Sequence, residues 1–326
     1  MTTSLNSSET LLRGSNPLPT ILVHTKIIDN FGDLGVAYRV AKLLSKSKEF
    51  MVVLYISGKL PERFVFDHDN NYLVICTDSD SINIKFDHIV TTFSSVVPEK
   101  FLSGFRKPVL NVDYLLLRSY DKSWEKRIDL PPSLIDGLIT SDVMGPESLS
   151  TFEWNIYWFT YHKHIPRGLI NYLSQSQKPV VITTAIDKGS KSVGNLTIKT
   201  HEFCTQENFD KILASSHINF VRGEDSFVRS MLTGNLTFWH PYSVGSSDRP
   251  YFNQRYLDNW PLYLRKSYYS VQNAFLNCSQ DPNDFKDIDQ LLENYHQVHR
   301  LTNEWKAYIL SKPCVTKRLE KYFDSL

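Results

Sequence analysis

The sequence predicts an α/β protein built from two parallel-sheet units and a helical C-terminal segment. Three observations support this fold class. Short apolar runs alternate with helical patterns in the first half of the chain, the same alternation returns in the second half, and only helical patterns follow Tyr251. At 326 residues, the chain is also long enough for two domains of ordinary size.

The first unit begins with an apolar, β-branched run at residues 21–27. A turn-like loop with two glycines, residues 29–35, follows it, and helical spacing begins at Val36. We therefore expect a strand, a glycine loop and a helix. Further strands are expected at residues 50–56, 72–76, 87–91, 109–112 and 138–140.

The second unit repeats the alternation. Strands are expected at residues 180–184, 196–199, 218–221 and 236–239, with helices at 207–215, 226–232 and within 281–311. We place the boundary in the aromatic-rich segment 153–159. The expected division is a flexible tail at 1–20, a first Rossmann-like domain at 21–155, and a second at 156–326 that includes the terminal helices.

Composition limits the classes of function. The formal net charge of +1 offers no broad attraction to nucleic acid or to an anionic membrane, and no apolar run approaches the ~20 residues that span a bilayer. The four cysteines are far apart and include no Cys-x-x-Cys pair, which argues against a zinc cluster or a disulfide framework. We expect a cytoplasmic monomer.

The most informative segment is residues 218–229, where an apolar run stops at a glycine. Arg222 supplies a permanent cation, Gly223 a bend, and Ser226 a hydroxyl, while Glu224 and Asp225 supply acceptors. This order is typical of a strand that runs into a helix N-terminus that binds an anion such as a diphosphate. An ordinary capped helix after a buried strand is the alternative.

The loop at residues 29–35 carries two carboxylates, Asp29 and Asp33, directly after the first strand. The carboxyl edge of a parallel sheet is where such proteins place ligands. The loop has neither the Gly-x-Gly-x-x-Gly spacing nor the Gly-Lys-Ser/Thr of a P-loop, which disfavours a dinucleotide or ATP role. Helix capping by Asp33 and a turn acceptor role for Asp29 are the alternatives.

Other candidates carry weaker signals. Phe203 and Gln206 precede a predicted helix, where a ring could pack on a base and an amide could bond its edge. His240 suggests acid–base chemistry, although a lone histidine beside a buried strand is more often structural. His162 and His164 lack a metal pattern and read as an exposed loop. The Asp-x-Asp at Asp78 to Asp80 is best explained by chance.

Three segments together carry a specific resemblance: residues 29–35, 219–229 and 238–242. Asp-Asn-Phe-Gly-Asp-Leu-Gly, Asn-Phe-Val-Arg-Gly-Glu-Asp-Ser-Phe-Val-Arg and Phe-Trp-His-Pro-Tyr, in this order, resemble the bacterial protein-arginine rhamnosyltransferases of the EarP family. The similarity runs from Ile21 to about Trp260.

The resemblance implies a GT-B type glycosyltransferase, with two Rossmann-like domains facing a cleft. It also implies inverting transfer of L-rhamnose from dTDP-β-L-rhamnose to an arginine of elongation factor P, with no metal or other cofactor. The family's aspartate pair falls on Asp29 and Asp33. We expect Asp33 to be the general base, because a carboxylate that bonds one guanidinium nitrogen can orient it and take its proton. The family's donor-binding residues fall on Phe203, Gln206, Arg222, Glu224, Asp225, Ser226 and Tyr242, with an aromatic within residues 159–161 that we assign to Tyr161. We count Glu224 among the catalytic residues too, with Asp29 and Asp33.

Two alternatives stay open. One is a GT-B enzyme that uses another nucleotide sugar or another acceptor. The other is a non-catalytic module that binds a nucleotide sugar, because paired α/β domains also occur in many binding proteins. Loss of a carboxylate from the first loop would indicate the second alternative, and both Asp29 and Asp33 are present.

Overall fold

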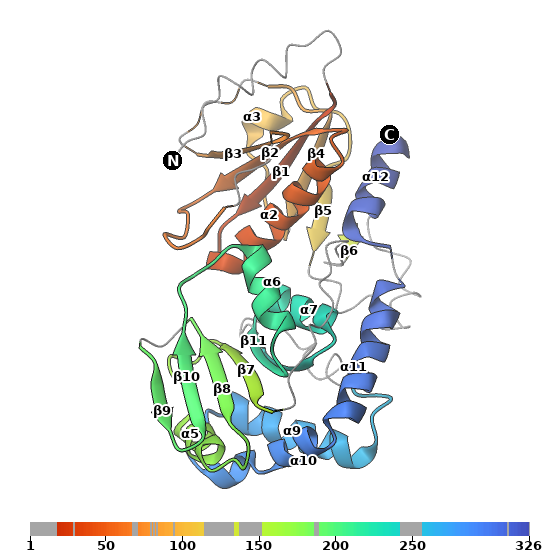
Figure 1. Ribbon diagram of the computed structural model, residues 1–326. Helices are drawn as coiled ribbons and strands as arrows, with labels where there is room; N and C mark the ends of the chain where they lie inside the picture. The colour runs from red at the N-terminus through yellow and green to blue at the C-terminus, as the bar shows by residue number, and fades with distance from the viewer. Residues whose placement is uncertain are drawn as a thin grey trace. The chain divides into compact units, whose positions relative to one another are not determined.

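The chain forms two compact units, each built around a six-stranded sheet, in a computed structural model (Figure 1). One unit comprises residues 1–142 with 313–326, and the other comprises residues 143–312. The structure describes residues 18–28, 30–66, 71–78, 80, 82, 84–93, 95–113, 134–136, 152–185, 189–241, 256–311 and 313–325. The prediction of two α/β units followed by helices is confirmed.

The first sheet is parallel throughout, in the strand order β3-β2-β1-β4-β5-β6. Its strands are β1 (Thr20–Lys26), β2 (Met51–Ser57), β3 (Leu73–Thr77), β4 (His88–Thr92), β5 (Leu110–Asp113) and β6 (Leu134–Asp136). Its helices are α2 (Asn30–Lys46), α3 (Glu99–Leu102) and α12 (Val315–Ser325). The first six residues of β1 and of β2 are buried, as expected for strands covered on both faces.

The second sheet has the order β12-β11-β7-β8-β10-β9 and is parallel except for β9, which runs antiparallel to β10. Its strands are β7 (Trp154–Phe159), β8 (Val180–Thr184), β9 (Lys191–Val193), β10 (Leu196–Thr200), β11 (Ile218–Arg222) and β12 (Leu236–His240). Its helices are α5 (Arg167–Ser174), α6 (Gln206–Ala214), α7 (Glu224–Thr233), α9 (Leu262–Leu276), the 3-10 helix η1 (Pro282–Phe285), α10 (Asp287–Glu293) and α11 (Tyr295–Leu310).

The division between the units differs from the expected one in two respects. The expected boundary at 155/156 lies inside β7, so the second unit begins before that strand. The last helix, α12, lies in the same unit as the first sheet (Figure 1). The ring of Phe323 in this helix packs against Phe50 at 5.6 Å and His88 at 4.3 Å. Helical spacing in a sequence reveals an apolar face but does not say which domain covers it.

Helix α9 covers the outer strand β12 of the second sheet and supplies the hydrogen bonds that this strand lacks on its free side. The Gln272 side chain brackets Trp239: its Oε1 accepts from the backbone N–H at 3.1 Å, and its Nε2 donates to the carbonyl at 2.6 Å. The Tyr268 hydroxyl donates to the Thr237 carbonyl at 2.8 Å. An uncovered strand edge would otherwise offer its peptide groups to other chains.

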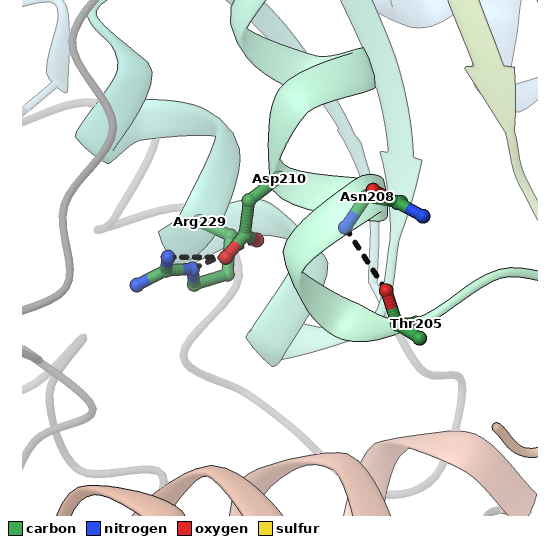
Figure 2. A network of polar contacts seen from close by, with 4 residues as sticks. All are labelled: Thr205, Asn208, Asp210 and Arg229. Carbon is green, nitrogen blue, oxygen red and sulfur yellow. Dashed lines mark hydrogen bonds and ion pairs between the residues drawn. The ribbon is translucent and has the colours of Figure 1, made fainter. Parts of the chain in front are cut away.

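A buried ion pair joins α6 to α7, which lie side by side (Figures 1 and 2). Arg229 Nε donates to Asp210 Oδ1 at 3.0 Å and Nη2 to Oδ2 at 2.5 Å, with the two side chains 2% and 6% exposed. The geometry is bidentate, which fixes orientation as well as distance.

At the start of α6, the Thr205 hydroxyl accepts the Asn208 N–H at 3.3 Å and caps the helix (Figure 2).

Two general features of the described residues bear on function. No helix among them is long and apolar enough to cross a membrane. All four cysteines are free thiols, with Cys76 buried and the other three partly buried.

We expect Arg229→Met to lower the free energy of unfolding of the second unit by about 3–5 kcal/mol, because it leaves the buried Asp210 carboxylate without its cation. Arg300→Met is the matched control, since Arg300 pairs with Glu304 on the surface and is 63% exposed. That change should cost about 0.5 kcal/mol or less. Urea denaturation of both variants checks the difference, and equal costs would contradict a structural role for the buried pair.

Candidate functional site

The junction of β11 with α7 has the structure that its sequence predicts, a strand that turns directly into a helix. Gly223 is the N-cap of α7 and has φ 63° and ψ −176°, a conformation that is essentially restricted to glycine. Its N–H donates to the His240 carbonyl at 3.1 Å, and its carbonyl accepts from Trp239 Nε1 at 2.7 Å. Both polar backbone groups of Gly223 are therefore bound to β12, and the turn is fixed.

The first turn of α7 has the properties of an anion site. Because Gly223 has no side chain, the N-cap offers no acceptor of its own to the amides that begin the helix. Asp225 and Ser226 lie in this turn and are partly buried. The positive end of the helix dipole also lies here, so a phosphate oxygen could bind the amides and the Ser226 hydroxyl together.

Arg222, the last residue of β11, is held between two aromatic rings. Its Cζ lies 4.6 Å from the ring centre of Phe159 and 5.0 Å from that of Tyr161, and its Nη1 donates to the Thr160 carbonyl at 3.5 Å. A guanidinium stacks on ring faces and keeps its N–H groups available at the edge. The rings therefore orient the cation at the end of the strand, immediately before the helix N-terminus.

Tyr161 also adjoins the turn itself. A Cβ atom at Gly223 would lie 3.3 Å from the Tyr161 hydroxyl, so this hydroxyl is a direct neighbour of the glycine. Tyr161, assigned from the range 159–161, thus lies beside Arg222 and Gly223. The sequence alone did not identify Phe159 as a neighbour of Arg222. The available signal was strand alternation: alternate residues of a strand face the same side, so Phe159 shares a face with Tyr157, and the two ring centres lie 6.3 Å apart.

One face of helix α6 contacts Phe159, one of the two rings beside Arg222. Phe209 packs edge-on against Phe159 at 5.6 Å, and Asp210 binds Arg229 of α7. Gln206 precedes Phe209 by three residues and therefore shares its face of the helix. Gln206 is the first residue of α6 rather than part of the preceding loop as expected, while Phe203 does lie in that loop and is partly buried.

The two histidines near the junction are neighbours. The ring of His162 lies 4.5 Å from that of His240, and His240 meets Tyr161 edge-on at 5.2 Å. His162 Nε2 donates to the Phe275 carbonyl at 2.9 Å, which ties the segment after β7 to the end of α9. His162 is thus partly buried and structural, which corrects the expectation of an exposed loop, whereas His164 is exposed.

In the first unit, Asp33 lies in the first turn of α2 and is 6% exposed. Its Oδ2 accepts the backbone N–H of Ile28 at 2.7 Å, so the carboxylate reaches back to the segment that leads into the helix. This contact resembles that of a capping box rather than that of an N-cap side chain. It holds one oxygen of Asp33 in place at the carboxyl end of β1.

Three predicted site residues lie wholly or partly outside the described positions. Asp29 and Tyr242 lie outside the described residues, and for Glu224 only the backbone position is described, as the first residue of α7. Within the described ranges, no group of three or more His, Cys, Asp or Glu residues is placed to hold a metal ion.

Comparison with known proteins gives a consistent result. The family model described as "Elongation-Factor P (EF-P) rhamnosyltransferase EarP" matches residues 22–123 and 150–324. A protein-arginine rhamnosyltransferase of Neisseria meningitidis serogroup B is 24% identical over 379 residues, which cover 92% of this chain and 96% of the relative. A protein of the same name from Pseudomonas putida is 47% identical over 49 residues, 15% of this chain and 13% of the relative.

Solved structures agree on the fold. The structure titled "Structural basis for EarP-mediated arginine glycosylation of translation elongation factor EF-P" matches with a TM-score of 0.60 at 18% identity, and covers 94% of this chain and 99% of that chain. A UDP-glucosyltransferase from Polygonum tinctorium matches with a TM-score of 0.58 at 9% identity, over 95% and 99% of the two chains. The fold is therefore GT-B, as predicted.

We expect Gly223→Ala to destabilise the second unit by about 1–3 kcal/mol, because alanine must adopt a backbone conformation that side chains disfavour. It should also shift the indole N–H resonance of Trp239, which donates to the Gly223 carbonyl. Gly104→Ala is the control, since Gly104 also has a positive φ of 80° but has open space around it. An unchanged Trp239 resonance in Gly223→Ala would show that the turn tolerates a side chain.

Proposed function

The chain belongs to the EarP family of elongation factor P rhamnosyltransferases, and we propose that it transfers L-rhamnose from dTDP-β-L-rhamnose to an arginine of elongation factor P. The transfer inverts the anomeric centre, with Asp33 as general base. The observation that carries the proposal is the arrangement of Arg222 between Phe159 and Tyr161 at the N-terminus of α7. A cytoplasmic location is part of the proposal, because the acceptor is a translation factor.

The donor half of the reaction needs a group that stabilises the negative charge on the departing diphosphate. Arg222, the Ser226 hydroxyl and the first amides of α7 supply positive charge and hydrogen-bond donors at one place, already oriented before the sugar bond breaks. Tyr242 would add a further hydroxyl. With this set of donors, the reaction requires no metal ion or other cofactor.

The carboxylates of the donor site have other roles in this proposal. Glu224 and Asp225 would repel a phosphate, so Glu224 binds hydroxyls of the sugar or the ribose, and Asp225 orders the turn through backbone bonds. Phe203 lines the nucleotide pocket and Gln206 bonds the edge of the base. One observation supports the role of Gln206. It shares a face of α6 with Phe209, and Phe209 packs against Phe159, the ring that contacts Arg222.

The acceptor half has to overcome the chemistry of arginine. A guanidinium keeps its proton below a pH of about 12, and its nitrogen lone pairs are delocalised, so it is a poor nucleophile. Asp33 binds one guanidinium nitrogen, orients it, and removes a proton as the nitrogen attacks the anomeric carbon. Asp29 holds the guanidinium or the loop, and the pair complements its positive charge.

A single displacement accounts for the whole reaction. The guanidinium nitrogen forms its bond to the anomeric carbon while the bond to the diphosphate oxygen breaks, the proton goes to Asp33, and dTDP leaves with the electron pair. Attack from the side opposite the leaving group inverts the β-linked donor to an α-linked product, so the enzyme needs no second nucleophile.

The test of the reaction is intact-mass spectrometry of purified elongation factor P after incubation with the enzyme, dTDP-β-L-rhamnose and EDTA. We expect the acceptor to gain the mass of one deoxyhexose with the wild type, and Asp33→Asn to reduce the rate at least ~100-fold because it removes the base. Asp87→Asn is the control, since this exposed carboxylate binds Thr20 at the opposite end of β1.

Near-normal turnover by Asp33→Asn would contradict its role as base. No mass gain with the wild type, despite binding of dTDP, would contradict the donor–acceptor pair and leave another nucleotide sugar, another acceptor or a binding role to be examined.

A second prediction concerns the phosphate site. We expect Arg222→Ala to weaken dTDP binding by about 10- to 100-fold, the loss of one or two hydrogen bonds to a charged group. Arg222→Lys should recover only part of the affinity, because an ammonium does not stack between Phe159 and Tyr161 as the planar guanidinium does. Calorimetry with dTDP measures both, with Arg300→Ala as control. Wild-type affinity in Arg222→Ala would remove this residue from the phosphate site.

A further inference from the structure

Asp78, which follows β3, binds the end of the neighbouring strand β2 through three hydrogen bonds. Its Oδ1 accepts from the Tyr55 hydroxyl at 3.0 Å and from Ser57 Oγ at 3.3 Å, and its Oδ2 accepts from the Gly58 N–H at 2.9 Å. Asp78 is the first carboxylate of the Asp-x-Asp pattern in the sequence. Its contacts fix the last residue of β2 and the residue after it.

Ser57 transmits this constraint to the segment that leads to Asp33. The Ser57 carbonyl accepts the Ile27 N–H at 3.0 Å, and the next amide, that of Ile28, donates to Asp33 Oδ2 at 2.7 Å. Two consecutive amides are thus bound, one to Ser57 and one to Asp33. The Ile28 side chain is 75% exposed, so this segment is held by hydrogen bonds rather than by burial of its side chain.

Two further side chains complete the network and fix the direction of its protons. Lys100 Nζ donates to the Tyr55 hydroxyl at 3.0 Å, which leaves the tyrosine proton for Asp78. The fully buried His24 lies 3.1 Å from Ser57 Oγ through Nε2. Since an ionised carboxylate only accepts, Ser57 donates to Asp78, and His24 donates to Ser57.

The charge states agree with this arrangement. The Gly58 amide is the main cause that holds the pKa of Asp78 below its ordinary value, so the carboxylate stays ionised at neutral pH. Burial lowers the pKa of His24 to about 4, although Asp78 opposes the shift, so the imidazole is neutral. A neutral imidazole donates from one nitrogen only, in keeping with the single contact from Nε2.

We propose that Asp78 is a positioning residue for the acceptor half of the reaction, acting through Ser57 on the segment that carries Asp29 and Asp33. The inference rests on the proposed function, in which Asp33 is the base. Three donors of β2 and the residue after it bind the carboxylate of Asp78, so its proposed role is to hold this strand end rather than to react. A shift of the base by about 1 Å can cost 100-fold in rate, which is why a contact one strand away matters.

Asp80, the second carboxylate of the pattern, has a separate and local task. Its Oδ2 accepts from the Thr77 N–H at 2.7 Å and from the Thr77 hydroxyl at 3.0 Å, which closes the turn after β3. The pattern therefore divides into one carboxylate that binds its own turn and one that binds the neighbouring strand.

The first arm of the test measures hydrogen exchange without any substrate. In Asp78→Ala we expect the Ile27 amide to exchange at least tenfold faster than in the wild type, because Ser57 is no longer fixed. Asp87→Ala is the matched control: this exposed carboxylate also accepts from one N–H and one hydroxyl, both of Thr20, at the amino end of β1. Its Ile27 amide should exchange at the wild-type rate.

The second arm measures transfer to elongation factor P. We expect Asp78→Ala to lower kcat by about 10- to 100-fold while the KM for dTDP-β-L-rhamnose stays within about twofold, because the donor residues lie on the other unit. Asp78→Asn should restore only part of kcat, since the amide has a single accepting oxygen, which can bind either the Gly58 N–H or the two hydroxyl protons but not all three. Tyr55→Phe, which removes one donor, should give a smaller loss and carries the test if Asp78→Ala does not fold.

The two arms separate failure of the inference from failure of the proposed function. Wild-type exchange at Ile27 in Asp78→Ala would overturn the link through Ser57, and faster exchange with unchanged kcat would overturn its catalytic consequence. If the KM for dTDP-β-L-rhamnose rose by the same factor as kcat fell, and Asp78→Asn recovered no activity, the variant would be generally destabilised. That result would also overturn the positioning role of Asp78. If the wild type transfers no rhamnose, the proposed function and the catalytic part of the inference both fail, whereas the exchange arm still decides the link.

Discussion

The backbone of Gly223 is the constraint on which the candidate donor site depends. Its positive φ allows β11 to turn into α7 within one residue, and its N–H and carbonyl are both bound to β12. The turn therefore keeps a fixed distance between the cation before it, Arg222, and the hydroxyl after it, Ser226. If a longer and looser loop joined Arg222 to Ser226, that loop would lose more conformational entropy when both residues bound one ligand.

The surroundings of this turn hold it by packing and by charge. The rings of Phe159 and Tyr161 support Arg222, and the ring of Phe227, in α7, stacks on that of Trp239 at 4.7 Å. The buried ion pair of Asp210 and Arg229 holds α6 against α7. The face of α6 that carries Gln206 also carries Phe209, which packs against Phe159. In the proposed reaction, donors held in this way suit stabilisation of the charge that grows on the leaving group.

The first unit positions Asp33 in a different way. Asp33 is anchored by the backbone amide of Ile28, whose side chain is exposed. A polar network that runs from Lys100 through Tyr55 and Asp78 to Ser57 holds the neighbouring amide, that of Ile27. Hydrogen bonds of this kind are directional, and their loss shifts a loop without unfolding the sheet below it. In the proposed reaction this suits an element that must meet a protein substrate.

The sequence by itself determined the two α/β units, most of their strands, the turn at Gly223 and the family, because apolar runs, glycines and ordered motifs are local signals that need no knowledge of the fold. Only the tertiary structure decided which sheet covers α12, which rings hold Arg222, and that Asp78 is linked to Asp33 through Ser57. These are contacts between residues far apart in the chain. A periodic pattern shows that a side chain needs a partner, but the choice of partner depends on how the strands are ordered and on which faces the helices cover.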